Sequence, residues 1–148
     1  MPEHKYPRAG VGVLVINEEN KILLGRRHED PEKADSLLHG AGQWTMPGGK
    51  LDWQLTPLAG AKKELTEETG LIAKKMELVS VTNDAVEDNH FITIGFKCTE
   101  YEGRPKVMEP DEITEWQWFN TDEVPENMYG SSKKLLDNYL NKRLYSDE

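Results

Sequence analysis

The sequence has little cysteine and no long apolar run. Cys98 is the single cysteine among 148 residues, so an internal disulfide is excluded and a reducing compartment such as the cytoplasm is expected. No apolar stretch approaches the ~20 residues that a membrane-spanning helix requires. Met1 to Arg8 has no apolar core, so we expect no signal peptide there and no membrane partner.

Positive charge is also scarce. The chain carries 18 Lys and Arg residues against 27 Asp and Glu residues, a formal net charge of -9. Nucleic acid polymers and anionic membranes favour basic surfaces, so neither is expected as a partner. A small phosphate ligand is not excluded, because local cations and a metal decide that. The length suits one domain that spans residues 1–148 and contains one core.

A short helix is expected near the middle of the chain. The Thr56 hydroxyl can accept a hydrogen bond from a free N–H of the first turn, and Pro57 suits the first helical position. Gly70 can end the helix in the left-handed conformation. Between these residues, the glutamates share one helical face because they lie three and four positions apart. They are Glu64, Glu67 and Glu68.

Carboxylates that converge on one helical face have two interpretations. They can form a solvated acidic surface, or they can bind a hard divalent cation whose shell is completed by substrate phosphates. Polar and apolar patterning elsewhere predicts further elements. These are a buried strand over Ala9–Ile16, its hairpin partner over Lys21–Arg27, strands over Met76–Asn83, His90–Thr99 and Glu115–Phe119, a helical turn over Thr121–Val124, and an amphipathic helix over Ser131–Leu144.

The segment around the acidic helix resembles the Nudix box, the signature of hydrolases that act on nucleoside diphosphates linked to another group. The family pattern is Gly, five residues, Glu, seven residues, Arg-Glu-aliphatic, any residue, Glu-Glu, any residue, Gly-aliphatic. This chain matches seven of the nine defined positions. The matching residues are Gly49, Glu64, Leu65, Glu67, Glu68, Gly70 and Leu71.

Two positions depart from the pattern. Leu55 stands where the family has Glu, and Lys63 stands where it has Arg. In the family these two residues form an ion pair that steadies the loop and orients the metal-binding glutamates. Lysine is a poor copy of a forked arginine, and Leu55 has no carboxylate. Leu55→Glu combined with Lys63→Arg is therefore expected to raise activity.

The resemblance implies a fold, a cofactor and a set of site residues. The implied fold is α/β, a Nudix α/β/α sandwich with a mixed β-sheet, and the implied cofactor is Mg2+, with Mn2+ as the alternative. The metal ligands would be Glu64, Glu67, Glu68 and the carbonyl of Gly48. The catalytic base would be Glu64 or Glu67, or a carboxylate of the loop from Glu109 to Glu115. Substrate contacts are expected from Arg27, Thr45, Gly49 and Asn83, with the strand of Trp116 and Trp118 as a further candidate.

A second likeness suggests the substrate. Segments such as Glu77–Asn83 and Met108–Glu112 resemble MutT-like enzymes, which cleave nucleoside triphosphates, including oxidised dGTP, to monophosphate and pyrophosphate. The expected partner is thus a small nucleotide, and related enzymes are often homodimers. The alternatives are a nucleotide-sugar hydrolase, or a Nudix-fold binding or regulatory module with weak or lost catalysis. A globular domain without a ligand would require the match to be accidental.

Overall fold

The computed structural model of the protein describes residues 5–34 and 39–147. The remaining residues, 1–4, 35–38 and 148, lie outside the described part. Within that part the chain forms seven strands and two helices. They are β1 (Arg8–Val15), β2 (Ile22–Arg27), β3 (Trp44–Thr45), β4 (Gly48–Lys50), α1 (Pro57–Thr69), β5 (Ile72–Val86), β6 (Asn89–Glu102), β7 (Ile113–Phe119) and α2 (Gly130–Leu140).

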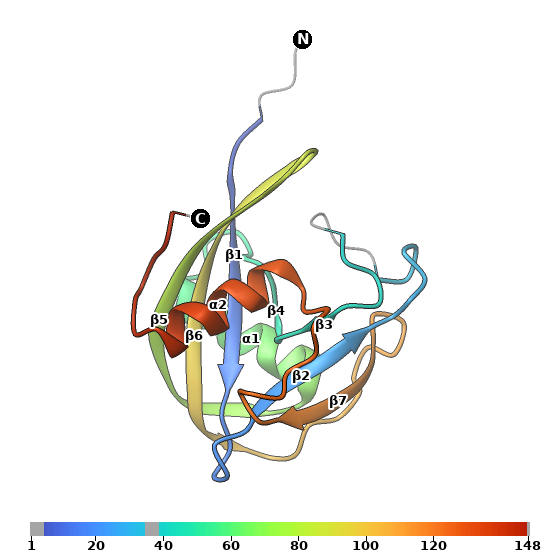
Figure 1. The fold of residues 1–148 in the computed structure, drawn as a ribbon, viewed down its shortest axis with the longest axis vertical. Helices are drawn as coiled ribbons and strands as arrows, with labels where there is room; N and C mark the ends of the chain where they lie inside the picture. Colours follow the sequence, from blue (N-terminus) through green and yellow to red (C-terminus); the bar gives the residue numbers. More distant parts are fainter. Residues whose placement is uncertain (1–4, 35–38, 148) are drawn as a thin grey trace.

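The strands form two sheets. The larger has the order β4-β1-β6-β5 and is mixed, because β1 runs parallel to β6 while the β1–β4 and β5–β6 pairs are antiparallel. The smaller, β3-β2-β7, is antiparallel throughout. Figure 1 shows α2 in front of the larger sheet and α1 behind it. The predicted α/β/α sandwich with a mixed sheet is thus confirmed.

Strand β1 is buried on both faces, as its nearly uninterrupted apolar sequence predicted. Successive side chains of a strand point to opposite faces, so β1 contributes to two cores. Val11, Val13 and Val15 pack with Leu65 of α1. On the other face, Leu14 and then Ile16 pack with Leu135 of α2. Strand β1 is therefore packed between the two helices.

The predicted hairpin between the first two strands is wrong. A single antiparallel bridge joins Ile16 to Ile22, and beyond it β2 enters the smaller sheet and pairs with β3 and β7. The polar turn Asn17–Asn20 closes through Asn20 N–H to Asn17 O, at 3.0 Å, but it leads the chain from one sheet to the other. The segment 121–124 forms a turn and no helix.

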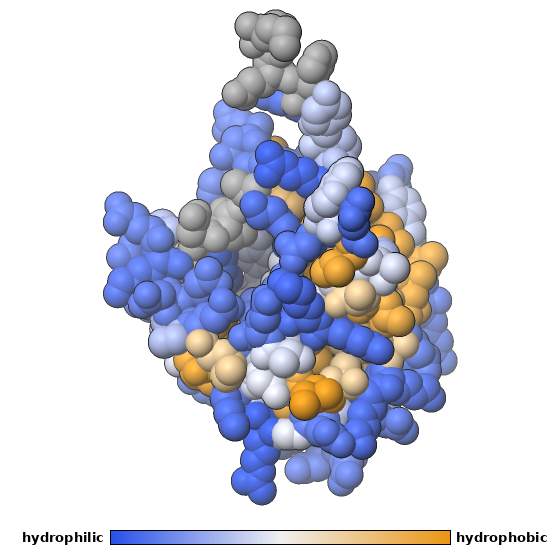
Figure 2. Space-filling view, turned by 180° about the vertical axis from the view of Figure 1, so that it is seen from behind, coloured by the Kyte–Doolittle hydropathy of each residue, from blue (hydrophilic) through white to orange (hydrophobic). Residues whose placement is uncertain are grey.

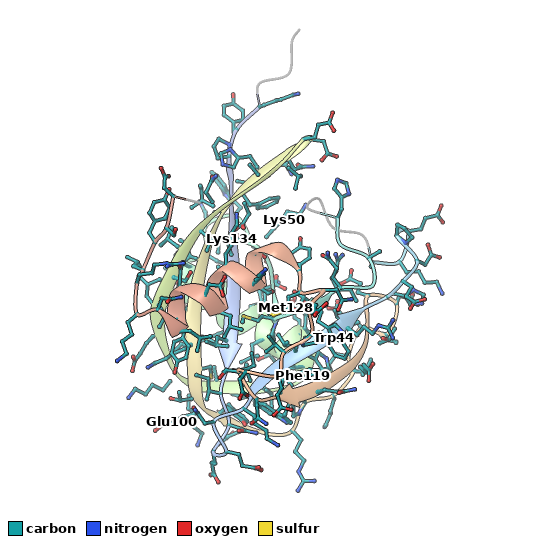
Figure 3. The ribbon with its side chains drawn as sticks, in the orientation of Figure 1. Trp44, Lys50, Glu100, Phe119, Met128 and Lys134 are labelled. Atoms are coloured by element: carbon teal, nitrogen blue, oxygen red, sulfur yellow. The ribbon has the colours of Figure 1, made fainter. Side chains whose placement is uncertain are left out.

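The start of α2 is fastened to β3. The Trp44 N–H donates to Asn127 O at 3.0 Å, and the Tyr129 N–H donates to Trp44 O at 2.6 Å. Trp44 also packs edge-on against Phe119, with ring centroids 5.2 Å apart, beside Met128 (Figure 3). These contacts fix the position from which α2 enters the sandwich.

No helix within residues 5–34 and 39–147 is long and apolar enough to cross a membrane.

Candidate metal and substrate site

Helix α1 begins and ends as its sequence predicted. The Thr56 hydroxyl accepts from Ala59 N–H at 3.1 Å, and Gly70 ends the helix with φ +78°. The Gly48 N–H of β4 donates to Glu68 Oε2 at 2.7 Å. This bond ties the last turn of α1 to the strand that leads into the loop before it. Glu68 consequently lies against β4, while the side of the molecule seen in Figure 2, on which α1 lies, exposes both hydrophilic and apolar residues.

The Glu68 carboxylate is buried and lies close to two acidic residues of a distant loop. Ligand oxygens of Glu68, Glu109 and Glu112 lie within 4.8 Å of one another. Burial is the main reason that the pKa of Glu68 is raised well above its usual value, and the nearby carboxylates add to the shift. Three oxygen ligands at this separation fit a hard cation such as Mg2+.

Glu64 lies one helical turn before Glu68, beside Gly49. An atom placed at the Cβ position of Gly49 would be 3.1 Å from the Glu64 carboxylate, so the two residues are in contact. Burial, and then the negative charge of Glu67, raise the pKa of Glu64 to about 7. Glu67 lies at the solvent-facing side of α1 and pairs with Lys63. Glu64, Glu67 and Glu68 therefore differ in burial although they share one face.

A cavity of about 470 Å3 is lined by this acidic cluster and also by residues of β6 and α2. Its first half is lined by carboxylates from α1 and the 109–112 loop. Its second half is lined by β6 residues Phe91 and Thr93, by Leu135 of α2, and by Tyr129 just before α2. One half is thus suited to cations and phosphates, and the other offers an aromatic ring, a hydroxyl and an aliphatic surface.

Most of the sequence-predicted residues line this cavity. They are Arg27, Thr45, Gly48, Gly49, Glu64, Glu67 and Glu68. Thr45 is also fixed internally, because its hydroxyl donates to Met46 O at 2.9 Å and lies 3.1 Å from Ser132 Oγ. Arg27 is buried, and its Nη2 donates to Ala34 O at 2.8 Å. The Arg27 guanidinium lies 5.0 Å from the centre of the Tyr129 ring.

Asn83 does not line the cavity. Its side chain contacts His90, and its carbonyl accepts from Lys134 Nζ at 2.5 Å. Trp116 and Trp118 are also outside the cavity, since both pack against the core beneath α1. Trp118 stacks on Tyr101 with ring centroids 6.3 Å apart. The two tryptophans therefore pack on the core and do not line the cavity.

Sequence reasoning did not assign metal ligation to Glu109 and Glu112, nor a place in the cavity to Tyr129. The acidic run Glu109–Glu112 is the sequence signal for this loop, which the resemblance implies only as a source of the catalytic base. Its proximity to Glu68 depends on the loop after β6, which no local pattern predicts. The place of Ser132 in the site could not be predicted from local sequence either, because its contact with Thr45 joins residues 87 positions apart.

The raised pKa of Glu64 leads to a prediction about stability in the absence of metal. The unfolded chain releases this proton near pH 4.5, whereas the folded protein keeps it to about pH 7. The folded state therefore binds more protons between these values, and its stability falls as pH rises through that window. In chelator, urea unfolding from pH 4.5 to 7.5 should show the wild type losing stability relative to Glu64→Gln. Glu18→Gln, at an exposed turn, is the control, and its curve should stay parallel to the wild type; a parallel Glu64→Gln curve would contradict the assignment.

A model of the NUDIX domain matches residues 6–139. Among curated relatives, a MutT-like protein of Streptomyces ambofaciens is 30% identical over 127 residues, covering 86% of this chain and 71% of the relative. An RNA pyrophosphohydrolase of Zymomonas mobilis is 23% identical over 153 residues, covering 91% of this chain and 93% of the relative.

Solved structures share the fold. A MutT NUDIX hydrolase from Burkholderia pseudomallei superposes with a TM-score of 0.79 at 29% identity, covering 90% of this chain and 98% of that one. A MutT protein from Methanosarcina mazei gives a TM-score of 0.76 at 23% identity, covering 95% and 97%. The match thus extends over nearly the whole sandwich and well beyond the acidic helix.

Proposed function

Because the chain belongs to the Nudix family of pyrophosphohydrolases, we propose that its substrate is a nucleoside triphosphate, cleaved to a nucleoside monophosphate and pyrophosphate. An oxidised nucleotide such as 8-oxo-dGTP is a specific candidate. The observation that carries the proposal is the cavity, in which a carboxylate cluster adjoins a half lined by Phe91, Thr93 and Tyr129. A triphosphate would meet the carboxylates through cations, and its nucleoside would lie toward the other half.

Mg2+ is the proposed cofactor, with Mn2+ as an alternative. Glu68, Glu109 and Glu112 would bind it, and Glu64, Glu67 and the Gly48 carbonyl would complete the ligand set around further ions or waters. The donors are all oxygens, which fits a hard cation. When bound, the metal would neutralise the phosphate oxygens and acidify a coordinated water.

The residues of the chain would then position the reactants and accept a proton. Glu64 is our first candidate for the general base where Glu68, Glu109 and Glu112 hold the ion, because it lies beside Gly49 in the cavity and its carboxylate is then available to accept a proton. Glu67 is the alternative. Attack of water on phosphorus forms one P–O bond, and the bond to the leaving group breaks in line. Arg27 would contact the substrate from the wall of the cavity. Its guanidinium is held in place there because it donates to Ala34 O.

A second candidate substrate is the 5′-triphosphate end of an RNA. The observation in its favour is the similarity to relatives named RNA pyrophosphohydrolase. The net charge of -9 argues against a long nucleic acid footprint. A nucleotide sugar is a third candidate substrate. The alternative to an enzyme is a binding module that has lost catalysis, which would bind nucleotide at the acidic cluster without turnover.

Incubation with a substrate panel tests the proposal. Purified protein is mixed with nucleoside triphosphates, 8-oxo-dGTP, nucleotide sugars and a 5′-triphosphorylated RNA oligonucleotide, with Mg2+ or chelator, and products are separated by chromatography. We expect Mg2+-dependent monophosphate and pyrophosphate from a nucleoside triphosphate. Faster release of pyrophosphate from the RNA would favour the second candidate. Nucleotide binding without any product would overturn hydrolysis, and the Glu68→Gln variant controls for contaminating enzymes.

A further inference from the structure

Lys63 joins the loop before α1 to the acidic face of the helix. Its Nζ lies 2.9 Å from Asp52 Oδ2 and 2.8 Å from Glu67 Oε1. Asp52 and Glu67 both line the cavity, whereas Lys63 contacts them from outside it. Hydrogen bonds to Glu67 and to Asp52 raise the pKa of Lys63, so the ammonium stays charged. One cation therefore links two carboxylates that belong to different segments.

Lys63 thus has carboxylate partners although Leu55 offers it none. Asp52 and Leu55 are the two ends of one turn, because the Leu55 N–H donates to Asp52 O at 3.1 Å. Gln54 completes the turn with φ +67°. The carboxylate that the family pattern places at position 55 is thus supplied from the other end of the same turn. Leu55 itself is half-buried.

A solvated surface pair would have little consequence, since exposed ion pairs contribute little to stability. The surroundings of Glu67 give this pair another consequence. Glu67 shares the cavity with Glu64, and the two carboxylates repel each other. Lys63 draws Glu67 toward Asp52, which limits the orientations that the Glu67 side chain can adopt. The effect of the pair therefore falls on the geometry of a proposed metal ligand rather than on the fold.

We propose that Asp52 is a positioning residue that acts through Lys63 to orient Glu67 for divalent metal. The Asp52–Lys63–Glu67 bridge replaces the ion pair that the departures at Leu55 and Lys63 remove. The inference rests on the proposed metal-dependent hydrolysis. If Asp52 has this role, Leu55→Glu combined with Lys63→Arg is not expected to raise activity. Lys63 already has a carboxylate partner in Asp52, so the double variant restores no missing ion pair.

Metal binding and kinetics together test the bridge. Mn2+ affinity is measured by electron paramagnetic resonance, and kcat and nucleotide KM are measured at varied Mg2+. We expect Lys63→Met to weaken Mn2+ binding and lower kcat about 10- to 100-fold, as is typical for residues that orient metal ligands. The KM of Lys63→Met should change less than its kcat, and its melting temperature should stay near that of the wild type. Lys62→Met, at the preceding exposed position of α1, is the matched control.

Rescue variants separate positioning from a general loss of charge. Lys63→Arg should retain most of the Mn2+ affinity, and Asp52→Asn should lose it in the same proportion as Lys63→Met. Asp52→Asn combined with Leu55→Glu should recover affinity, because the new carboxylate enters from the same turn. Wild-type affinity in Asp52→Asn, or no recovery in the double variant, would overturn the proposal. Absence of turnover in the wild type would instead refute the proposed function, while the Mn2+ affinities would still test the bridge.

Discussion

Replacing Glu68 with glutamine is expected to lower turnover by about 10³-fold while stabilising the metal-free protein. The loss follows from the metal's contribution of several kcal/mol to the transition state, because every ~1.4 kcal/mol corresponds to a tenfold change in rate. The gain in stability follows from burial. The Glu68 carboxylate is desolvated next to Glu109 and Glu112, and a neutral amide removes that cost in the absence of metal.

The substitution isolates metal ligation from loop packing. The carbonyl oxygen of the new amide can still accept from Gly48 N–H, which Glu68 Oε2 contacts at 2.7 Å in the wild type. Steady-state kinetics and thermal unfolding, each with Mg2+ and with chelator, measure the two effects. We expect Mg2+ to raise the melting temperature of the wild type and to leave that of Glu68→Gln unchanged. Glu100→Gln, at an exposed position of β6 that does not line the cavity, is the control.

A folded Glu68→Gln protein with wild-type turnover would exclude Glu68 as a metal ligand. Stabilisation of this variant by Mg2+ to the wild-type extent would exclude it as well. Loss of turnover with lower stability in chelator would instead indicate that the carboxylate is needed for the fold, contrary to the desolvation argument.

Gly48→Ala is expected to damage both stability and turnover. An added Cβ would lie 2.3 Å from Val11 O and 3.0 Å from Gly12 Cα, both of which are backbone atoms of β1. Strand β4 pairs there in the register Gly12↔Gly48, so it would have to move away. Such overpacking costs about 1–3 kcal/mol. The displaced strand would also carry the Gly48 carbonyl and N–H out of place, and a shift of ~1 Å can reduce a rate about 100-fold.

Gly49→Ala is the matched comparison. Its Cβ would approach the Glu64 carboxylate at 3.1 Å, a flexible side chain rather than backbone. We expect a smaller loss of stability than for Gly48→Ala, with a clear loss of kcat because Glu64 is displaced. Urea unfolding and initial rates measure both variants. Equal stability of Gly48→Ala and the wild type would show that β4 does not pack on β1 at the described distance.

The local signals in the sequence predicted local structure well. The bounds of α1 follow from Thr56, Pro57 and Gly70, whose capping effects need only a few neighbouring residues. The double burial of β1 follows from its composition. The sheet to which β2 belongs could not be predicted in the same way, because a short turn such as Asn17–Asn20 is compatible with either sheet and the choice depends on pairing with residues near 116.

The same distinction between local and distant determinants applies to the residues of the candidate site. Helical spacing alone brought Glu64, Glu67 and Glu68 to one face. Distant contributors such as Glu112 reach the cavity only through the loop after β6. The contact of Lys63 with Asp52 was not predictable from helical spacing, because Asp52 lies outside α1 and reaches Lys63 only through the turn that precedes the helix. Asn83 follows the acidic helix in sequence, but side-chain alternation in β5 places it outside the cavity.

The division of the cavity into two halves has an evolutionary consequence. The carboxylates come from α1 and the 109–112 loop, whereas Phe91, Thr93, Tyr129 and Leu135 come from β6 and the start of α2. Under the proposed function, mutations in the second group leave the carboxylates unchanged. Substrate preference can therefore change without a change in the residues that carry out hydrolysis. Exchange of a few side chains of the second group would then change which nucleotide is bound while the carboxylates stay the same.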